Sequence, residues 1–217
     1  MRRGDAFFLD AVAALGDDQL REPSLLTGWT RAHIVTHMAR NADGLGNLLT
    51  WARTGVETPM YVGDQRERDI EAGVERPVGE QREDAAQASA RFIDACESLP
   101  EEAWDAKVKT RMGREISGAA IPWFRCRESW VHSVDLDSGI GFADLPDEFV
   151  TQLLEEVAAG LAGRDDCPAM HVVRTDAEGE WRLGSGGPEV KESGAALLGW
   201  LLGRRPIDGA PAAPRWL

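Results

Sequence analysis

The sequence predicts a mainly α-helical protein, with a four-helix bundle over residues 1–142 and a small α+β domain over residues 143–217. Four long segments with helical spacing of apolar residues lie before residue 138. After residue 142 the pattern changes to short apolar runs bounded by turn residues, mixed with further helical spacing. The chain has 217 residues and is 43% hydrophobic, which is enough for one large domain or two small ones.

The bundle helices are predicted from apolar residues that recur every three or four positions. The four segments with this spacing cover residues 6–20, 31–53, 83–99 and 119–137. Thr30 has the side chain of an N-cap for the second helix. Pro100 ends the third helix, and Pro122 is tolerated in the first turn of the fourth.

Two connecting segments in the first part of the chain are less regular. Residues 54–81 form a long polar stretch with several glycines and prolines, and stretches of this length are usually functional or disordered. A short helix is predicted within it, over residues 65–72. Residues 104–117 mix apolar and charged side chains around Gly113, a pattern that fits an irregular excursion as well as a short hairpin.

The second part of the chain combines helical and strand patterns. A helix is predicted over residues 146–163, followed by strands at 171–175 and 181–184. The D-A-E-G sequence at 176–179 favours a hairpin between these strands. Residues 189–202 are predicted to form a closing helix. Together these elements indicate a small α+β domain.

Composition and charge restrict the partners. The formal charge of −13, from 37 acidic and 24 basic residues, argues against nucleic acid and against an anionic membrane surface. No apolar run approaches the ~18 residues of a membrane span, and Asp5 and Asp10 interrupt what would be the core of a signal peptide. Cys96, Cys126 and Cys167 are odd in number and widely spaced, which favours a reducing cytoplasm over a disulfide framework.

The residues with the most chemical content lie on the predicted second and fourth helices. Glu128 and His132 are four positions apart, so they share one helix face, and Asp135 extends that face by one turn. A catalytic zinc site needs about three protein ligands, and His37 on the second helix is the best candidate for the third. Bundle cores commonly hold such sites. On spacing alone, a surface Glu–His pair is the competing interpretation.

Three motifs resemble a known family. They are G-W-T-R-A-H-I-V-T-H-M-A-R-N-A-D at 28–43, L-L-T-W-A-R-T-G-V-E-T-P-M-Y at 48–61 and R-E-S-W-V-H-S-V-D-L at 127–136. All three resemble the mycothiol-dependent maleylpyruvate isomerases, whose superfamily has a DinB-like four-helix bundle and a divalent metal. The resemblance implies that His37, Glu128 and His132 are ligands of Zn²⁺. It also implies a substrate-handling arginine in G-W-L-L-G-R-R-P at 199–206, for which we prefer Arg204 over Arg205.

The function implied by the resemblance is the cis-trans isomerisation of maleylpyruvate to fumarylpyruvate, a step in aromatic (gentisate) degradation. A zinc-activated thiolate of mycothiol would be the nucleophile and would be returned unchanged. Two alternatives stay open: a mycothiol S-transferase acting on another electrophile, and a non-catalytic metal-binding regulatory protein. Two histidines and one carboxylate also suit iron(II). The mycothiol-binding residues and the oligomeric state are not predicted.

Overall fold

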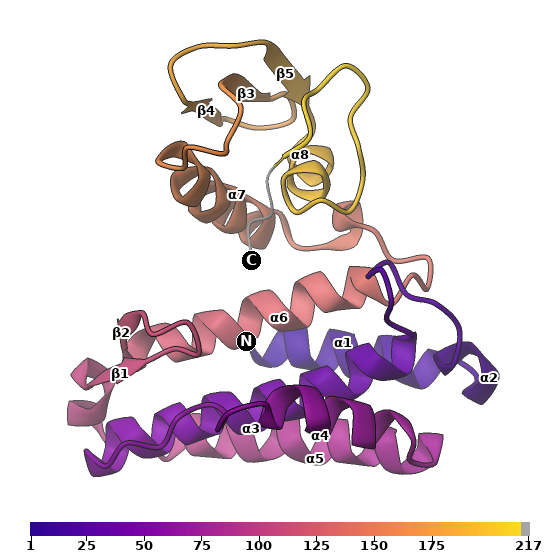
Figure 1. Cartoon of the computed structure of the whole chain (residues 1–217), viewed down its shortest axis with the longest axis vertical. Helices are drawn as coiled ribbons and strands as arrows, with labels where there is room; N and C mark the ends of the chain where they lie inside the picture. The colour runs from indigo at the N-terminus through magenta and orange to yellow at the C-terminus, as the bar shows by residue number, and fades with distance from the viewer. Residues whose placement is uncertain (214–217) are drawn as a thin grey trace. The chain divides into compact units, whose positions relative to one another are not determined.

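The computed structural model describes residues 1–213, which fold into two compact units, Met1–Gly139 and the described residues from Ile140 onward (Figure 1). The first unit is built almost entirely from helices, and the second combines helices with a three-stranded sheet. The predicted mainly α-helical class is therefore confirmed. The domain boundary after residue 142 stays a prediction, although the division between the two units falls close to it. No described helix combines the length and the apolar composition needed to cross a bilayer.

The first unit is a four-helix bundle (Figure 1). Its helices are α1 (Arg2–Ala14), α3 (Arg31–Thr54), α5 (Val78–Glu97) and α6 (Ile121–Asp135). Helix α3 packs against α5 and α6, and α1 packs against the same two helices, so the four close a ring around one core. The apolar side chains that predicted these helices, such as Phe8, Ile34, Met38, Phe92 and Phe124, are buried there.

The predicted helix over residues 6–20 is wrong as a single element. Helix α1 ends at Ala14, Leu15 adopts an extended conformation with φ −79° and ψ 140°, and a separate short helix α2 (Asp17–Leu20) follows. The Gly16 N–H donates to Gln19 Oε1 at 2.7 Å, which starts the new helical turn. Glycine also has a low helix propensity, so the helix is interrupted at this point, and Leu20 of the second helix is fully buried.

The long polar stretch contains the predicted short helix, α4 (Gln65–Val74), which packs on α3. This packing depends on Gly73, because a Cβ atom there would lie 2.3 Å from Thr36 Cγ2 on α3. Helix α5 begins at Val78, earlier than the predicted 83, because Pro77 is extended and occupies the N-cap position. The stretch thus places a helix directly over the residues of α3 around Thr36.

Residues 101–120 resolve the alternative that the sequence left open in favour of a hairpin. Strands β1 (Lys107–Lys109) and β2 (Glu115–Ser117) pair antiparallel with Val108 opposite Ile116, and short helical turns η1 (Glu101–Asp105) and η2 (Gly118–Ala120) flank them. Gly113 has φ 76°, a left-handed conformation that closes the turn at little cost for glycine. Val108 and Ile116 are the buried members of the hairpin.

The second unit pairs two helices with a sheet in the order β4-β3-β5. The elements in chain order are η3 (Phe142–Asp144), α7 (Asp147–Ala162), β3 (Met170–Arg174), β4 (Glu180–Leu183), β5 (Glu189–Glu192) and α8 (Gly194–Leu201). Strands β3 and β4 form the predicted antiparallel hairpin. Helix α7 packs on α8 and on β4, and α8 packs on β3 and β5, so the helices cover the sheet.

The predicted closing helix over residues 189–202 is wrong in its first part. Residues Glu189–Glu192 form β5, which pairs in parallel with β3. The sequence E-V-K-E alternates a buried Val190 with exposed charged neighbours, which is the period of a strand. The helix starts only after Ser193, whose Oγ accepts a hydrogen bond from the Ala196 N–H at 3.4 Å.

Candidate metal centre

The centre lies between α3 and α6, and polar contacts at the start of α3 fix its position. Thr30 and His33 form a capping box, in which the Thr30 N–H donates to His33 Nδ1 at 3.1 Å and the Thr30 Oγ1 lies 2.7 Å from the same nitrogen. The Arg31 side chain donates to the Asp137 carbonyl from Nη2 at 2.9 Å. Because Asp137 follows the end of α6, this contact ties the first turn of α3 to the last turn of α6.

His37, Glu128 and His132 converge in the space between these helices. Their ligand atoms lie within 4.8 Å of one another. Glu128 Oε2 is 3.0 Å from His37 Nε2 and 3.2 Å from His132 Nε2. The two imidazole rings meet edge to face, with centroids 4.8 Å apart. The helical spacing that placed Glu128 and His132 on one face is therefore realised, and the packing of α3 on α6 adds the third side chain.

Asp135 contacts the ring nitrogen of His132 that faces away from Glu128. It is fully buried, and its Oδ2 lies 2.9 Å from His132 Nδ1. This contact turns Nε2 of His132 toward Glu128 and His37. Histidines that bind metal usually donate their other ring N–H to a carboxylate or carbonyl in this way. Its helix face alone does not show whether Asp135 orients a histidine or faces solvent, and its burial and hydrogen bond favour the first role.

The charges of the three converging side chains differ sharply. Burial lowers the pKa of His37 to about 4, although the hydrogen bond with Glu128 opposes this shift. Burial opposes protonation of His132 too, but hydrogen bonds to Asp135 and Glu128 raise its pKa to about 9. Burial would raise the pKa of Glu128, yet the hydrogen bonds from His132 and His37 hold it well below its ordinary value. Glu128 is therefore ionised, His37 is neutral and His132 carries a proton.

This donor set fits a divalent cation. Two imidazole nitrogens and one carboxylate oxygen point at a common space, which is the ligand number of a catalytic zinc or iron(II) site with an open position. The His132 ring lies between two carboxylates, with Glu128 Oε2 at 3.2 Å from Nε2 and Asp135 Oδ2 at 2.9 Å from Nδ1. Among the residues that the structure describes, this is the group of histidine, cysteine and acidic side chains with metal-binding spacing.

Aromatic and basic side chains border the centre. The Trp29 ring centroid lies 5.5 Å from that of His37 and 6.0 Å from that of His33. Arg66 on α4 has Nη2 3.3 Å from His37 Nδ1 and its Cζ 5.7 Å from the Trp29 centroid. His33 itself serves the capping box and lies 3.7 Å from Glu71, so it is a packing residue and not a fourth ligand. Arg66 was not predicted, and the only sequence signal for it was the short helix within the polar stretch.

Arg204, the predicted substrate-handling residue, belongs to the second unit. It follows α8, where its N–H donates to the Gly199 carbonyl at 2.8 Å and its Nη1 donates to the Leu202 carbonyl at 2.7 Å. The Arg205 N–H also donates to the Gly199 carbonyl, at 3.2 Å. The role of Arg204, and the choice between it and Arg205, stay predictions.

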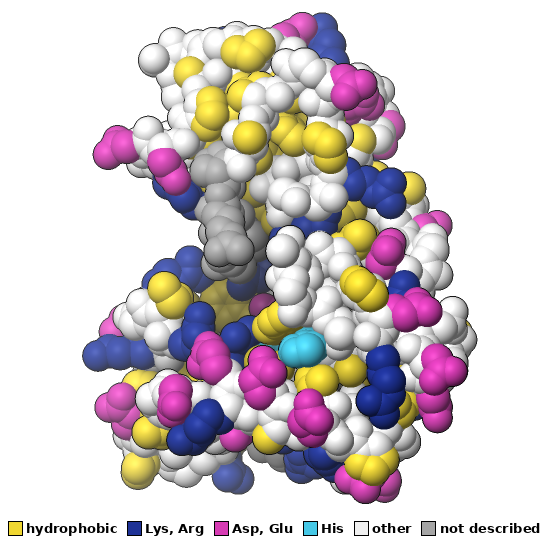
Figure 2. All heavy atoms as spheres, turned by 45° about the vertical axis from the view of Figure 1, so that its right-hand side comes forward, with side chains coloured by type: hydrophobic (Ala, Val, Ile, Leu, Met, Phe, Trp, Pro, Cys, Tyr) yellow, Lys and Arg dark blue, Asp and Glu magenta, His cyan; other side chains and the backbone are white. Residues whose placement is uncertain are grey.

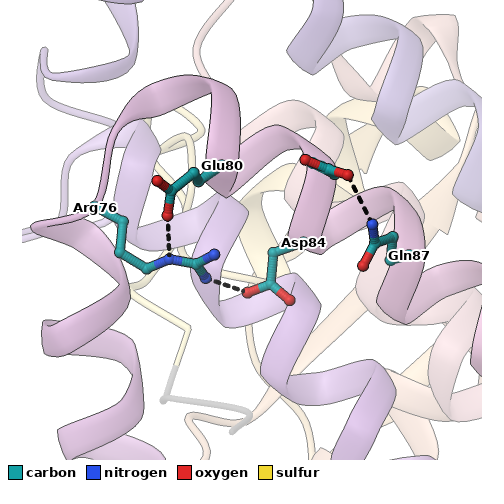
Figure 3. Close-up of a pocket in the computed structure, with 5 residues that line it drawn as sticks. Arg76, Glu80, Asp84 and Gln87 are labelled. Carbon is teal, nitrogen blue, oxygen red and sulfur yellow. Dashed lines mark hydrogen bonds and ion pairs between the residues drawn. The ribbon is translucent and has the colours of Figure 1, made fainter.

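A hollow of about 330 Å³ opens on the surface beside α5, away from the residues of the metal centre (Figure 3). Its charged groups are matched with one another: Arg76 Nε lies 3.2 Å from Glu80, Arg76 Nη1 lies 2.8 Å from Asp84, and Gln87 donates to Glu83 at 2.8 Å. Figure 2 likewise shows acidic and basic side chains interspersed over the face that it presents. This hollow is a solvated network of ion pairs and holds no reactive set of groups.

Comparisons with known proteins agree with this geometry. The family model described as the mycothiol maleylpyruvate isomerase N-terminal domain matches residues 1–137. Two solved structures, of a mycothiol-dependent maleylpyruvate isomerase and of its histidine-to-alanine mutant, each align with a TM-score of 0.93 and 29% sequence identity over 99% of this chain and 93% of theirs. A search of curated proteins found no match. The chain therefore belongs to the mycothiol maleylpyruvate isomerase N-terminal domain family, and its fold is the DinB-like four-helix bundle with a small α+β region.

Proposed function

We propose that this protein is a mycothiol-dependent isomerase that converts maleylpyruvate to fumarylpyruvate. The observation that carries the proposal is the convergence of His37, Glu128 and His132 in a chain that aligns over nearly its full length with a mycothiol-dependent maleylpyruvate isomerase. The substrate is a small dianion with a cis double bond conjugated to a carbonyl group. The partners are therefore that substrate and a low-molecular-weight thiol, and we expect the reaction to take place in the cytoplasm.

His37, Glu128 and His132 would hold a divalent cation, which we propose to be Zn²⁺, although the donor set also suits iron(II). A cation bound there would supply Lewis acidity and lower the pKa of a thiol that coordinates to it. Glu128 is already ionised and His37 is already neutral in the metal-free protein, so these two ligands need no proton loss. His132 must release one proton, and Asp135 keeps its ring in the orientation that binding requires.

The chemistry consists of an addition and its reversal. The thiolate sulfur of mycothiol forms a C–S bond to an alkene carbon, and the π electron pair moves onto the conjugated carbonyl to give an enolate. The former double bond is now a single bond and rotates. The electron pair then returns, the C–S bond breaks, and the thiol leaves unchanged with the product in the trans form. No oxidant or reductant is consumed.

The chain contributes orientation and a shielded environment to these steps. His37 is buried, and the Trp29 ring lies beside it with ring centroids 5.5 Å apart, which limits the access of water to His37. Arg204 of the second unit is proposed to bind the substrate, because a planar guanidinium suits a carboxylate or an enolate oxygen. The second unit and residues 54–81 would set which electrophile is accepted, and acceptance of a different electrophile would make the protein a mycothiol S-transferase.

The proposal is tested by metal analysis of the purified protein and by an isomerisation assay with and without mycothiol. We expect one zinc per chain and conversion that depends on mycothiol. His37→Ala should abolish turnover and weaken zinc binding, because it removes one of three protein ligands. His171→Ala, on β3 of the second unit, is the control and should retain zinc, because His171 pairs with Glu180 and is not one of the converging side chains. Normal turnover by His37→Ala would show that the metal centre is not the site of reaction.

A further inference from the structure

The two histidines of the centre differ in the group that contacts their Nδ1 atom. His132 Nδ1 faces the Asp135 carboxylate at 2.9 Å, as expected for a metal-binding histidine. His37 Nδ1 faces the guanidinium of Arg66, with Nη2 at 3.3 Å. Within residues 1–213, Arg66 is the group that contacts this nitrogen, and an arginine has only donors to offer. His37 therefore lacks the acceptor that His132 has.

The hydrogen-bonding roles of His37 must change when a cation binds. Arg66 can only donate, so Nδ1 of His37 accepts from it, and Nε2 then donates to the Glu128 carboxylate, with Oε2 at 3.0 Å. A cation held by His37, Glu128 and His132 would take Nε2, and a neutral imidazole then carries its proton on Nδ1. Two donors, His37 Nδ1–H and Arg66 Nη2–H, would then point at the same space and would need an acceptor between them.

The surroundings of Arg66 hold it in place and leave it accessible. Its Nη1 donates to Glu67 Oε1 at 3.3 Å, and Arg111 of the β1–β2 hairpin donates to the same oxygen at 3.2 Å. Its guanidinium lies over the Trp29 ring. The side chain is 20% exposed, so solutes can reach it. Two arginines share one carboxylate, which leaves local positive charge in a protein whose overall charge is −13.

We propose that Arg66 and the Nδ1–H of His37 together bind one carboxylate of the substrate. The inference rests on the proposed function in that it needs a cation on His37 and a dicarboxylate substrate. A carboxylate oxygen supplies the acceptor that both donors lack once the cation is bound, and hydrogen bonds between charged groups are about twice as strong as neutral ones. Arg66 is thus a specificity-determining residue that selects an anionic substrate at the metal centre of the bundle.

The experiment measures binding of maleate, a cis dicarboxylate, to the zinc-loaded protein by calorimetry in the absence of thiol. We expect Arg66→Gln to weaken maleate binding at least about tenfold, the usual effect of losing a charge-assisted hydrogen bond. Arg66→Lys keeps the charge but not the planar fork, so its affinity for maleate should lie between those of the unchanged protein and Arg66→Gln. Arg68→Gln is the matched control on the same helix, because Arg68 is 65% exposed and pairs with Asp64; it should change the affinity less than about twofold.

Zinc affinity gives a second readout that is independent of activity. Arg66→Gln should tighten zinc binding, by about tenfold, because it removes a cation from beside His37 and supplies an amide oxygen that accepts from Nδ1–H. A role limited to holding the fold would weaken zinc binding instead. With maleylpyruvate and mycothiol, KM should rise about tenfold while kcat changes by less than about threefold, because the carboxylate contact is present before and during the reaction.

The outcomes separate this inference from the proposed function. Maleate binding that depends on Arg66 in a protein that does not isomerise maleylpyruvate would support the carboxylate site and reject the proposed reaction. Normal isomerisation with unchanged maleate affinity in both Arg66→Gln and Arg66→Lys would overturn the carboxylate site and leave the reaction intact. Weaker zinc binding in Arg66→Gln would overturn the inference as well.

Discussion

At the scale of single residues, the centre depends on how each ionisable group is partnered. Glu128 contacts both histidines, and Asp135 contacts His132. The same burial that keeps His37 neutral would also suppress the charge on His132 if Asp135 were absent. Asp135 is therefore the residue that distinguishes the two histidines, although it is not one of the three converging side chains.

Asp135→Asn should weaken zinc binding by about tenfold to a hundredfold. The Asp135 carboxylate orients the His132 ring and makes its other nitrogen more basic, and the substitution removes both effects. The measurement is competition for zinc with a chelator of known affinity. Asp137→Asn provides the control, since Asp137 is exposed two residues later and has φ 50°, a conformation that asparagine tolerates. Equal zinc affinity in both variants would mean that Asp135 serves packing alone.

The pH dependence of zinc binding should follow His132. Its pKa of about 9 in the metal-free protein means that zinc must displace a proton at any lower pH. The apparent affinity should therefore rise about tenfold per pH unit from pH 6.5 to 9 and level off above. Stability of the metal-free protein should run the other way: the raised pKa stabilises it fully below pH 6.5, and this contribution is lost as the pH rises through 9. Calorimetry in buffers of different ionisation enthalpy would count the released proton; a flat profile would contradict the assignment.

At the scale of elements, the site depends on how closely α4 approaches α3. Gly73 makes this close approach possible, and the approach places Arg66 of α4 within hydrogen-bond distance of His37. Two contacts in the bundle core fix the neighbouring helices: Arg125 on α6 donates to the Met38 carbonyl on α3 at 2.8 Å and to Asp5 on α1 at 2.9 Å. These contacts join three helices around the level of the centre, which makes the relative register of α3 and α6 part of the ligand geometry.

Gly73→Ala should destabilise the protein by about 1–2 kcal/mol, because overpacking against the buried Thr36 outweighs the helix propensity that alanine adds. Urea unfolding measures the change in the free energy of unfolding. The matched control is Gly46→Ala in the middle of α3, where a Cβ would meet nothing within 4 Å. That variant should be more stable by up to about 1 kcal/mol. A gain of stability in Gly73→Ala would show that α4 moves away easily and does not fix Arg66.

At the scale of the whole molecule, the sequence predicted most of the architecture. The four bundle helices, the short helix in the polar stretch and the β3–β4 hairpin all follow from local periodicity and turn residues. The errors fall where local signals compete. Leu15 and Gly16 interrupt an otherwise helical pattern, and residues Glu189–Glu192 become a strand because they pair with β3, a partner about twenty residues earlier in the chain.

The candidate site, like the fold, could be predicted only in part from the sequence. The i, i+4 spacing of Glu128 and His132 determined by itself that these two side chains share a helix face, because helix geometry is local. The need for a third ligand from another helix pointed to His37, but only the packing of α3 on α6 decided that its Nε2 lies 3.0 Å from Glu128. Tertiary structure alone also decided the burial of Asp135 and the contact of Arg66 with His37, since both depend on how separate helices approach one another. Sequence periodicity records which face of a helix a residue occupies, whereas the identity of the opposing residue is set by the packing of the whole bundle.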